Sequence, residues 1–489
     1  MLPFQNLIIV DRKHPNPVYL QIANRLIQLI TEGLLQPGSK MPSSRALSEL
    51  INVHRKTIVA AYDEMASQDW IETTPRKGVV VSLKLPEIKP RSFNQKQKSA
   101  VYTAQSTFKF RLPVPVNYPS TLDAYQLIVN DGLPDARIAP INELLTGYKG
   151  VFQNTSRRKT LPPGDAAGSV RLRNELCRFF AESRGLKINN ENLLITRGAQ
   201  MAIYLAVQLL LKPGSVVLVG NPSYYLADLL FREAGAIIQR VPVDENGMDV
   251  DWIAAFCKKK KPDLLYIIPH HHHPTTVTLN AARRMQLLDI IRQYQFPVIE
   301  DDYDYDFHYQ SSPILPLASA KHAGMVIYIG SLTKALAPGF RLGYMIGNAD
   351  IIFAAMQYRR VLDIRGDQPL EDALAKMFHN GVMQRHLKKS VKLYRERRDI
   401  FCDLLHSQLH RQISFTPPAG GMAVWTQFAP SVDLIKMSKQ AAAKGLYISN
   451  GENYSNDGPK LNAIRMGFAS LNEKEMKEVI KILSGIISI

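Results

Sequence analysis

The segment Met325–Gly347, MVIYIGSLTKALAPGFRLGYMIG, constrains the fold of this chain more than any other stretch. It starts as an apolar run, breaks at Gly330-Ser331, turns through Pro338-Gly339 and returns as a second apolar run after Arg341. Short apolar runs bounded by Gly and Pro are typical of strands in a covered sheet. Lys334 stands between them, and an unpaired buried ammonium is costly. This lysine therefore either reaches solvent or is kept for chemistry as a neutral amine or an imine.

The neighbours of Lys334 point to a phosphate. Ser331 and Thr333 offer hydroxyl groups, and Arg341 offers a guanidinium that can hold a phosphate through two bonds. A lysine beside a phosphate site is suited to pyridoxal 5'-phosphate held as a Schiff base. Considered without these neighbours, Lys334 reads equally well as a solvated loop lysine.

Length and composition limit the number of domains and the class of protein. The 489 residues allow about three domains at roughly 150 residues each. No apolar run approaches the ~20 residues of a membrane helix, and Leu7–Val10 precedes its charges, which is the wrong order for a signal peptide. Three scattered cysteines fit a reducing cytoplasm without a disulfide or zinc framework, so we expect a cytoplasmic protein. The net charge of +17 favours an anionic partner, although solubility alone also explains it.

Residues 1–85 are expected to form a separate winged helix-turn-helix domain. Helices are predicted from Asn16-Pro17 onward, over 44–50 and over 54–67, followed by a small hairpin of residues 71–73 and 78–81. In such a motif the second helix of the pair enters the major groove of DNA. The sequence therefore predicts double-stranded DNA as a partner.

The predicted DNA contacts fall into two groups. Base edges would be met by the first residues of the last helix, which are His54, Arg55, Lys56 and Thr57. Phosphates would be met by Arg45 and by Arg76 and Lys77 on the hairpin, with Gly78 beside them. The alternative is a solvated basic face on a three-helix domain.

Beyond this domain the chain divides into a linker and a long α/β region. Residues 86–125 contain five prolines among basic residues, which predicts a semi-extended tether. From residue 126 to 489 strands and helices alternate, which predicts a mostly parallel sheet with helices on both faces and a small subdomain from about residue 365. Six basic residues between Lys388 and Arg398 are expected along one helix, as a solvated face. Strands are expected at 193–196, 216–219, 237–241, 264–268, 298–301 and 326–330.

Polar groups follow several of these strands, and ligands of such sheets bind at the carboxyl ends of the strands. Backbone N–H groups at Gly198, Ala199 and Gln200, where a helix begins, can bind phosphate. Tyr224 offers a ring that can stack on a planar cofactor, or it is a packing residue. Asp301 can keep a pyridinium nitrogen protonated. A Mg²⁺ site at Asp301 and Asp302 is the lesser option.

This order of phosphate loop, aromatic residue, acid, lysine and arginine resembles the fold-type I aminotransferases. The segment PGSKMPSSRALSELINVHRKTIVAAYDEMASQDWIETTPRKGVVV resembles the DNA-binding domain of GntR-type regulators. Together the two parts resemble the MocR family of transcription regulators, with its GabR, PdxR and TauR branches. Further stretches that carry the resemblance are DGLPDARIAP, NPSYY, VIEDDYDYDF, SLTKALAPGFRLGY and AIRMGFA.

The resemblance implies roles for individual residues. Lys334 would be the Schiff-base lysine, Asp301 would pair with the pyridine nitrogen, and Tyr303 would approach the ring hydroxyl. Tyr224 would stack on the ring, and Arg465 would hold a substrate or effector carboxylate. The residues implied around the phosphate are Gly198, Ala199, Gln200, Ser331, Thr333 and Arg341.

Two stretches depart from the family pattern. Where the family has a loop like HQFPTG, this chain has His271-His272-His273-Pro274-Thr275-Thr276, in which His273 can still donate to the ring oxygen. The run His270–His273 also invites a metal reading, but neighbouring residues of an extended chain point to opposite faces, so we expect no metal. Pro163 stands where the pattern often has a tyrosine that reaches the partner subunit's cofactor.

These observations lead to one function and one alternative. We expect a DNA-binding transcription regulator that senses an amino compound, or pyridoxal phosphate itself, through an internal aldimine at Lys334. The family resemblance implies a domain-swapped homodimer. The alternative is a working aminotransferase with an accessory DNA-binding domain, in which Lys334 also shuttles protons. A regulator that has lost the cofactor does not fit the intact set of Lys334, Asp301 and Arg341.

Overall fold

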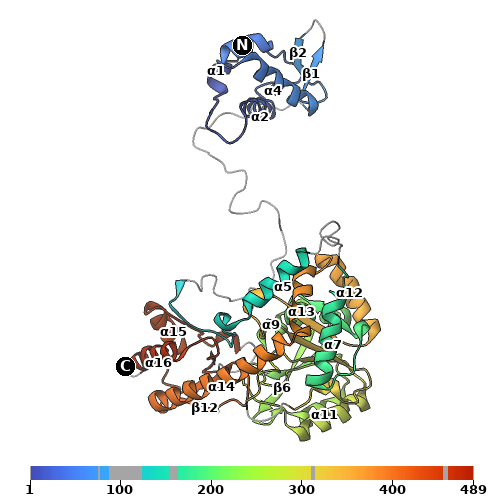
Figure 1. The fold of residues 1–489 in the computed structure, drawn as a ribbon, viewed down its shortest axis with the longest axis vertical. Helices are drawn as coiled ribbons and strands as arrows, with labels where there is room; N and C mark the ends of the chain where they lie inside the picture. Colours follow the sequence, from blue (N-terminus) through green and yellow to red (C-terminus); the bar gives the residue numbers. More distant parts are fainter. Residues whose placement is uncertain are drawn as a thin grey trace. The chain divides into compact units, whose positions relative to one another are not determined.

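The computed structural model describes residues 2–74, 78–86, 109, 124–153, 164–309, 314–454 and 461–487. Three residues singled out above, Arg76, Lys77 and Pro163, lie outside these ranges, as does most of the predicted linker. The chain divides into two compact units, Met1–Arg111 and Leu112–Ile489. Each unit is visible in Figure 1 and is described by itself.

The first unit is a bundle of helices with a two-stranded hairpin. Its elements are α1 (Phe4–Leu7), α2 (Val18–Thr31), α3 (Ser44–Leu50), α4 (Arg55–Ser67), β1 (Ile71–Thr74) and β2 (Gly78–Val81). Apolar residues at helical spacing on α2, such as Ile22, Leu26 and Leu29, are fully buried against Leu47 of α3 and Ile58 of α4. The two strands pair antiparallel, as the sequence predicts. This arrangement is a winged helix-turn-helix.

Polar caps set where the two helices of the helix-turn-helix begin. Ser43 accepts a hydrogen bond from the N–H of Ala46 at 3.1 Å and so caps α3. His54 caps α4 in the same way, because its Nδ1 accepts from the N–H of Lys56 at 3.2 Å. The ring of His54 is therefore held at the start of the helix expected to enter the DNA groove.

The second unit is built around an eight-stranded sheet in the order β4-β11-β10-β9-β8-β5-β6-β7. The strands from β10 to β6 run parallel to one another, whereas β11 lies antiparallel between β10 and β4, and β7 is antiparallel to β6. The sheet is thus mostly parallel, as predicted. Its strands are β4 (Leu193–Thr196), β5 (Val216–Asn221), β6 (Ile237–Asp244), β7 (Gly247–Met248), β8 (Leu264–Ile267), β9 (Val298–Asp301), β10 (Val326–Ser331) and β11 (Gly343–Ile346).

Helices cover both faces of this sheet (Figure 1). On one face α8 (Ala199–Leu210), α9 (Tyr225–Glu233) and α12 (Ala349–Asp363) pack against a first set of strand side chains. On the other face the covering helices are α10 (Val250–Lys259) and α11 (Ala281–Tyr294), together with α7 (Val170–Arg184) and α13 (Gln368–His379), on which α5 (Ile141–Gln153) packs. The apolar residues of each strand therefore alternate between two cores. This burial on both faces explains why the strands appear in the sequence as continuous apolar runs.

A smaller region follows the sheet. The antiparallel strands β12 (Ile413–Phe415), β13 (Ala423–Phe428) and β15 (Ala463–Gly467) pack with α14 (Val382–Leu409), α15 (Leu434–Ala443) and α16 (Glu473–Ile487). A separate pair joins β14 (Leu446–Ile448) to β3 (Leu127–Val129), which comes from the start of the unit. This pairing brings the segment after β3 close to the carboxyl-terminal part of the chain.

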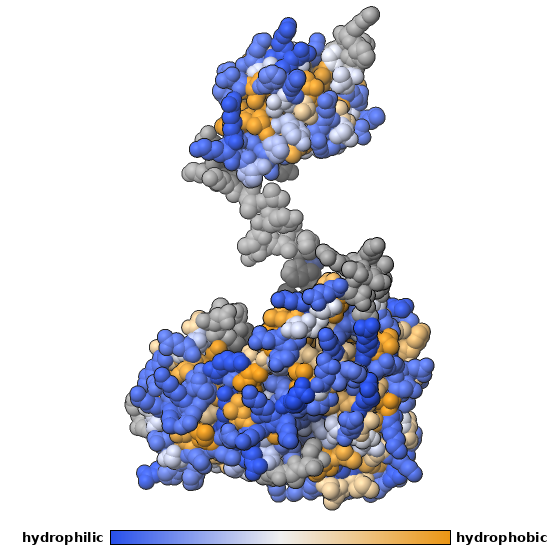
Figure 2. Space-filling model, viewed as in Figure 1, coloured by the Kyte–Doolittle hydropathy of each residue, from blue (hydrophilic) through white to orange (hydrophobic). Residues whose placement is uncertain are grey.

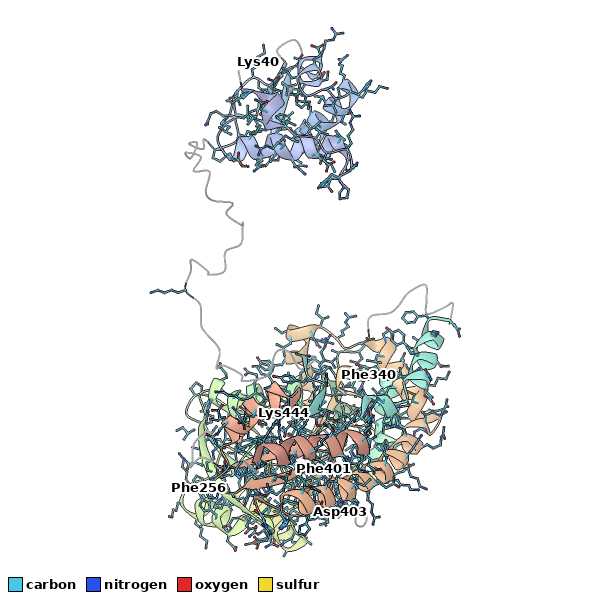
Figure 3. All side chains as sticks on the ribbon, turned by 90° about the vertical axis from the view of Figure 1, so that its left-hand side faces the viewer. Lys40, Phe256, Phe340, Phe401, Asp403 and Lys444 are labelled. Carbon is cyan, nitrogen blue, oxygen red and sulfur yellow. The ribbon has the colours of Figure 1, made fainter. Side chains whose placement is uncertain are left out.

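The long helix α14 has an apolar and a polar side. Phe401 and Asp403 are two positions apart on it (Figure 3), and Phe401 is buried whereas Asp403 is exposed. The six basic residues between Lys388 and Arg398 were expected to be solvated, but not all of them are exposed. Lys388, Lys389 and Arg395 are exposed, but Arg398 is buried, and its guanidinium donates to the carbonyl oxygen of Pro418 at 2.9 Å.

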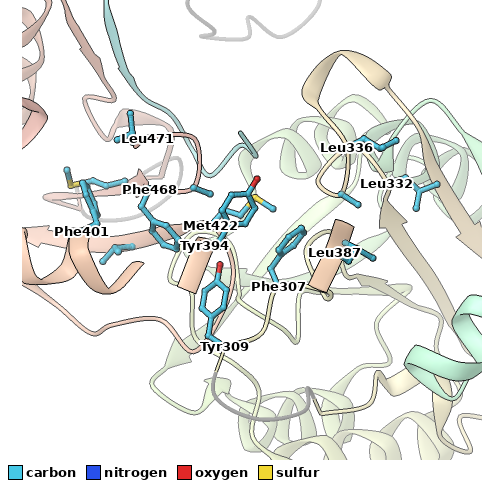
Figure 4. Packing of buried hydrophobic residues seen from close by; sticks show 14 of the residues in the cluster. Phe307, Tyr309, Leu332, Leu336, Leu387, Tyr394, Phe401, Met422, Phe468 and Leu471 are labelled. Atoms are coloured by element: carbon cyan, nitrogen blue, oxygen red, sulfur yellow. The ribbon is translucent and has the colours of Figure 1, made fainter. Parts of the chain in front are cut away.

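A core of aromatic and aliphatic residues lies beneath the loop that carries Lys334. Leu332 and Leu336, on either side of Lys334 in the sequence, are buried in the same cluster as Phe307 and Tyr394 (Figure 4). In the view of Figure 2, hydrophilic residues cover most of the larger unit, and apolar residues gather only in small patches. Among the described residues, no helix is both long and apolar enough to cross a membrane.

Candidate functional site

A cavity of about 480 Å³ lies at the carboxyl ends of the central strands. Thr196 ends β4, Asp301 ends β9 and Ser331 ends β10, so the residues that follow these strands converge there. All the expected cofactor-binding residues except Gly198 line this cavity. They are Ala199, Gln200, Tyr224, His273, Asp301, Tyr303, Ser331, Thr333, Lys334 and Arg341.

Lys334 is held in the cavity by its own loop. The buried side chains of Leu332 and Leu336 anchor the loop, and Lys334 Nζ donates to the carbonyl oxygen of Gly132 at 2.6 Å. Burial lowers the pKa of Lys334 to about 8. A substantial fraction of this amine is thus neutral near physiological pH, which is the form that attacks a carbonyl group.

Asp301 presents one uncommitted oxygen to the cavity. The hydroxyl of Tyr266 donates to Oδ2 of Asp301 at 2.7 Å, while Oδ1 is buried and has no hydrogen-bond partner among the described residues. Burial raises the pKa of Asp301 to about 7. An adjacent cation would reverse that shift, because an opposite charge stabilises the carboxylate.

The acids beside Asp301 point elsewhere, because successive side chains of a strand alternate between faces. Glu300 accepts from the N–H groups of Leu317 and Ala318 at 2.8 Å each. Asp302 accepts from the hydroxyl of Tyr328 at 2.9 Å and pairs with His270. Asp301 and Asp302 therefore do not converge on one point, which removes the geometric basis for the Mg²⁺ alternative.

The end of the cavity expected to hold phosphate is formed by the start of α8 and by Arg341. Gly198 precedes the helix with φ +82°, a conformation that favours glycine, and a side chain there would lie 3.0 Å from Nη2 of Arg341. Gly343 on β11 is equally constrained, since a Cβ would lie 2.7 Å from the Cα of Gly198. Because Gly198 and Gly343 have no side chain, the N–H groups at the start of α8 lie next to the guanidinium of Arg341. Both kinds of group can bind a phosphate.

Two aromatic residues and one histidine form the walls. Tyr224 and His273 lie edge to face with their ring centres 5.0 Å apart. The hydroxyl of Tyr303 donates to the carbonyl oxygen of His271 at 3.0 Å and accepts from Arg465 at 3.0 Å. The Tyr303 ring lies 5.5 Å from Lys334 Nζ. Tyr303 therefore links Lys334 to Arg465.

The four consecutive histidines separate onto different partners. His270 pairs with Asp302, His271 with Asp304, and His272 with the hydroxyl of Thr275. Only His273 of the four lines the cavity, and its Nε2 lies 2.7 Å from Asp131. Within the described ranges, no group of three or more His, Cys, Asp or Glu side chains is placed to hold a metal ion.

Arg465 and Asp131 form an ion pair. The sequence predicted a role for Arg465 but none for Asp131. Arg465 lies on β15 with a fully buried side chain, and its Nε is 3.4 Å from Oδ1 of Asp131. Asp131 lines the cavity and received no role from the sequence. Asp131 is the first residue of DGLPDARIAP, one of the stretches that resemble the family. Its partners His273 and Arg465 lie far from it in the sequence.

In the first unit, the expected DNA contacts lie on one exposed stretch. Arg45 of α3 and His54, Arg55 and Lys56 at the start of α4 are exposed, and Thr57 is half-buried. Arg55 Nε donates to the hydroxyl of Ser44 at 3.3 Å, which joins the two helices. Gly78 opens β2 with φ +95°. These residues form a polar surface at the amino end of α4.

The donor set fits pyridoxal phosphate. It combines an amine of lowered pKa at Lys334, a buried carboxylate oxygen of Asp301 and a helix amino terminus beside Arg341. Nδ1 of His273 is also buried without a partner among the described residues. These are groups for an aldehyde, a pyridinium nitrogen, a phosphate and a ring hydroxyl, respectively.

Known proteins match both units. The family model for aminotransferase class I and II matches residues 141–483, and that for the bacterial regulatory proteins of the gntR family matches residues 18–81. The probable rhizopine catabolism regulatory protein MocR of Rhizobium meliloti is 23% identical, over 98% of this chain and 95% of its own. The HTH-type transcriptional regulator TauR of Rhodobacter capsulatus is 26% identical, over 94% and 95%.

A solved structure supports the same assignment for the larger unit. The crystal structure of an archaeal alanine:glyoxylate aminotransferase is 29% identical, with a TM-score of 0.70, over 74% of this chain and 90% of that one. The fold and cavity define a fold-type I, pyridoxal phosphate-dependent protein that also contains a DNA-binding domain. The chain belongs to the aminotransferase class I and II family and has the architecture of the MocR and TauR regulators. The expected class, a pyridoxal phosphate-dependent transcription regulator, is confirmed.

Proposed function

We propose that this regulator changes its binding to DNA when an amino compound, or the cofactor itself, reacts at Lys334. One observation supports this most directly. Lys334, Asp301 and Arg341 line one cavity, in a chain that also contains a winged helix-turn-helix. The rival function, a working aminotransferase with an accessory DNA-binding domain, is less favoured because relatives that match nearly the whole chain are named as regulators.

Each residue of the cavity has a proposed task. Pyridoxal phosphate supplies an aldehyde that combines reversibly with primary amines. Lys334 would supply the amine that combines with this aldehyde, and Asp301 would keep the ring nitrogen protonated. Tyr224 would stack on the ring, and His273 and Tyr303 would hold its hydroxyl. The phosphate would be held by the backbone of Gly198, Ala199 and Gln200 and by Ser331, Thr333 and Arg341.

The response of the DNA-binding unit follows from differential binding. A ligand shifts an equilibrium between two arrangements only by the difference in its affinity for them. A Lys334 amine that is not bound to the cofactor contacts Gly132 and Tyr303, which border the segment after β3 and the strand β15. Release of Lys334 from the cofactor would therefore restore these contacts. We propose that this segment reports the state of the cavity to the rest of the chain.

DNA recognition is assigned to the amino end of α4. Arg55 and Lys56 are exposed there, and His54 is fixed by its cap, so their side chains can reach base edges in the major groove. Arg45, Arg76, Lys77 and Gly78 would contact the backbone and set the register. We also propose a cytoplasmic location, which is supported by the DNA-binding unit and by three cysteines that are free.

A homodimer is part of the proposal. Helix α12 exposes Phe353 and Val361, and Ile364 directly after it is exposed too, with exposed fractions of 59%, 85% and 65%. Exposed apolar residues gathered on one helix are typical of an interface. In the domain-swapped form, the winged helix of one chain would pack against the aminotransferase-like unit of the other. A dimer of this kind would bind two half-sites in the operator.

A single titration tests the proposal. The loaded full-length protein is titrated with a panel of primary amines and amino acids, while visible absorption and affinity for DNA selected from a random library are both measured. One compound should shift both, and Lys334→Ala should abolish both responses but retain DNA binding without the compound. Steady release of a 2-oxo acid without a change in DNA affinity would instead make the protein an aminotransferase.

A further inference from the structure

Asp131 occupies the position in the cavity where a ligand carboxylate would be expected. Its Oδ2 lies 2.7 Å from Nε2 of His273, and its Oδ1 accepts from the hydroxyl of Tyr454 at 3.1 Å. The same Oδ1 is 3.4 Å from Nε of Arg465. A guanidinium, an imidazole N–H and a phenol thus converge on one carboxylate, which is the donor set that recognises carboxylates in proteins.

The chain itself therefore supplies the anion for these donors. The side chain of Arg465 is fully buried and that of His273 is 6% exposed, whereas that of Asp131 is 43% exposed and lines the cavity. The ion pair of Arg465 is with the Asp131 carboxylate. Its hydrogen bonds go to neutral oxygens, which are the backbone carbonyl groups of Asp131 and Pro274 and the hydroxyl of Tyr303. Asp131 is among the residues that line the cavity and Arg465 is not, so a ligand in the cavity meets the carboxylate and not the guanidinium.

The backbone around Asp131 leaves it little freedom to withdraw. Asn130 Oδ1 accepts from the N–H groups of Gly132 and Leu133 at 3.0 and 2.7 Å. Its amide in turn donates to the hydroxyl of Ser470 at 2.7 Å. Gly132 adopts φ +83° and accepts the hydrogen bond from Lys334. The turn that presents Asp131 is therefore fixed on both sides.

The contacts of Asp131 also favour its negatively charged form. Burial favours the neutral acid, but the contacts with His273 and Arg465 outweigh it and hold the pKa of Asp131 below its usual value. A second carboxylate in the same place would meet a like charge within a few ångströms, which is strongly unfavourable in a partly buried site. An amine without that carboxylate meets no such repulsion, and a second cationic group on it would be attracted to the exposed edge of Asp131.

We propose that Asp131 determines the charge of the effector: it fills the carboxylate site of Arg465, and so selects a primary amine with no carboxylate on the carbon that bears the amino group. This inference rests on the proposed function and specifies its ligand class. It replaces the expectation that Arg465 holds an effector carboxylate, because that guanidinium already has one from Asp131.

The test compares two probes that have one amino group each and differ only by a carboxylate on the carbon that bears it, butylamine and norvaline. In the loaded full-length protein, butylamine should shift the visible absorption at a concentration at least tenfold below that of norvaline. In Asp131→Asn, which keeps the size of the side chain and removes its charge, this preference should vanish or reverse. Asp244→Asn is the matched control, since Asp244 also pairs with an arginine and is similarly exposed, but at the surface. Equal responses of the wild type to both probes, or an unchanged preference in Asp131→Asn, would overturn the inference.

A second measurement separates this inference from the proposed function. Calorimetry of the cofactor-free protein with propionate reports the carboxylate site alone. The inference predicts no detectable binding to the wild type and clear binding to Asp131→Asn, whereas propionate binding to the wild type would refute it. If the loaded protein shows no absorption from a lysine-bound cofactor, the proposed function fails, and the propionate result still decides the role of Asp131.

Discussion

The hydroxyl of Tyr266 donates a hydrogen bond of 2.7 Å to Oδ2 of Asp301 and leaves Oδ1 as the oxygen that faces the cavity. Both residues sit on neighbouring parallel strands, β8 and β9, so their relationship is fixed by the sheet. Tyr266 is itself buried. The bond orients the carboxylate and favours its charged form, which is the form that a protonated ring nitrogen requires.

Tyr266→Phe should therefore weaken cofactor binding. A hydrogen bond to a charged group contributes about 1.5–3 kcal/mol, so we expect the affinity for pyridoxal phosphate to fall by roughly tenfold or more. An absorption titration of the cofactor-free protein measures this. Tyr305→Phe, which loses only a 3.3 Å bond to the carbonyl oxygen of Ser183, is the control. Equal affinities of Tyr266→Phe and the control would mean that Tyr266 does not prepare Asp301.

The pKa of Asp301 predicts a pH dependence of stability in the cofactor-free protein. Burial raises this pKa from 3.8 to about 7, so between these pH values the folded protein retains a proton that the unfolded chain has lost. Stability contributed by Asp301 is thus lost as pH rises from about 4 to about 7. Asp301→Asn has no such loss, and its advantage over the wild type should grow with pH to at most about 4 kcal/mol. Urea unfolding at pH 5 and pH 8 measures the difference.

The neighbouring acid provides a control of opposite sign. Burial alone would raise the pKa of Asp302, but contacts with His270 and Arg184 outweigh burial and lower it. Asp302→Asn should therefore be destabilising, and more so above pH 4 than below it. A stability difference between Asp301→Asn and the wild type that stays constant with pH would contradict the account of Asp301.

Gly198 should be essential for the phosphate end of the cavity. Gly198→Val places a branched side chain at φ +82° and against Arg341, and backbone strain of this kind costs on the order of 1–3 kcal/mol. We expect a loss of at least tenfold in affinity for the cofactor. Gly339→Ala lies on the Lys334 loop with nothing within 4 Å of the new Cβ, and it should bind the cofactor normally. If both variants bind alike, the start of α8 does not hold the phosphate.

Arg55 should determine sequence preference in DNA. Loss of a side chain that reads a base edge costs about 1–3 kcal/mol and relaxes the preference at that position. The comparison is between Arg55→Ala and Asp63→Asn, an exposed position further along α4, on DNA selected from a random library by the wild type. Uniform weakening on selected and scrambled DNA would show instead that Arg55 contacts only phosphates.

Local patterns were sufficient to predict most elements but not all partners. The strands β4 and β9 follow Asn192 and Pro297 and end at Thr196 and Asp301, which bound their short apolar runs. The cap formed by His54 was missed, since histidine is not among the preferred capping residues. Asp131 was missed because Tyr454 and Arg465 lie more than 300 positions away and meet it only after β3 has paired with β14. Long-range contacts of this kind leave no periodic signal in the sequence.

Reduction of the loaded protein with borohydride, followed by peptide mass mapping, tests the central claim most directly. Reduction converts a reversible link between the cofactor and a lysine into a stable one. The account predicts a single modified peptide that contains Lys334, and no modification in Lys334→Ala. A stable label on another lysine, or no label in a protein that retains the cofactor's absorption, would contradict it.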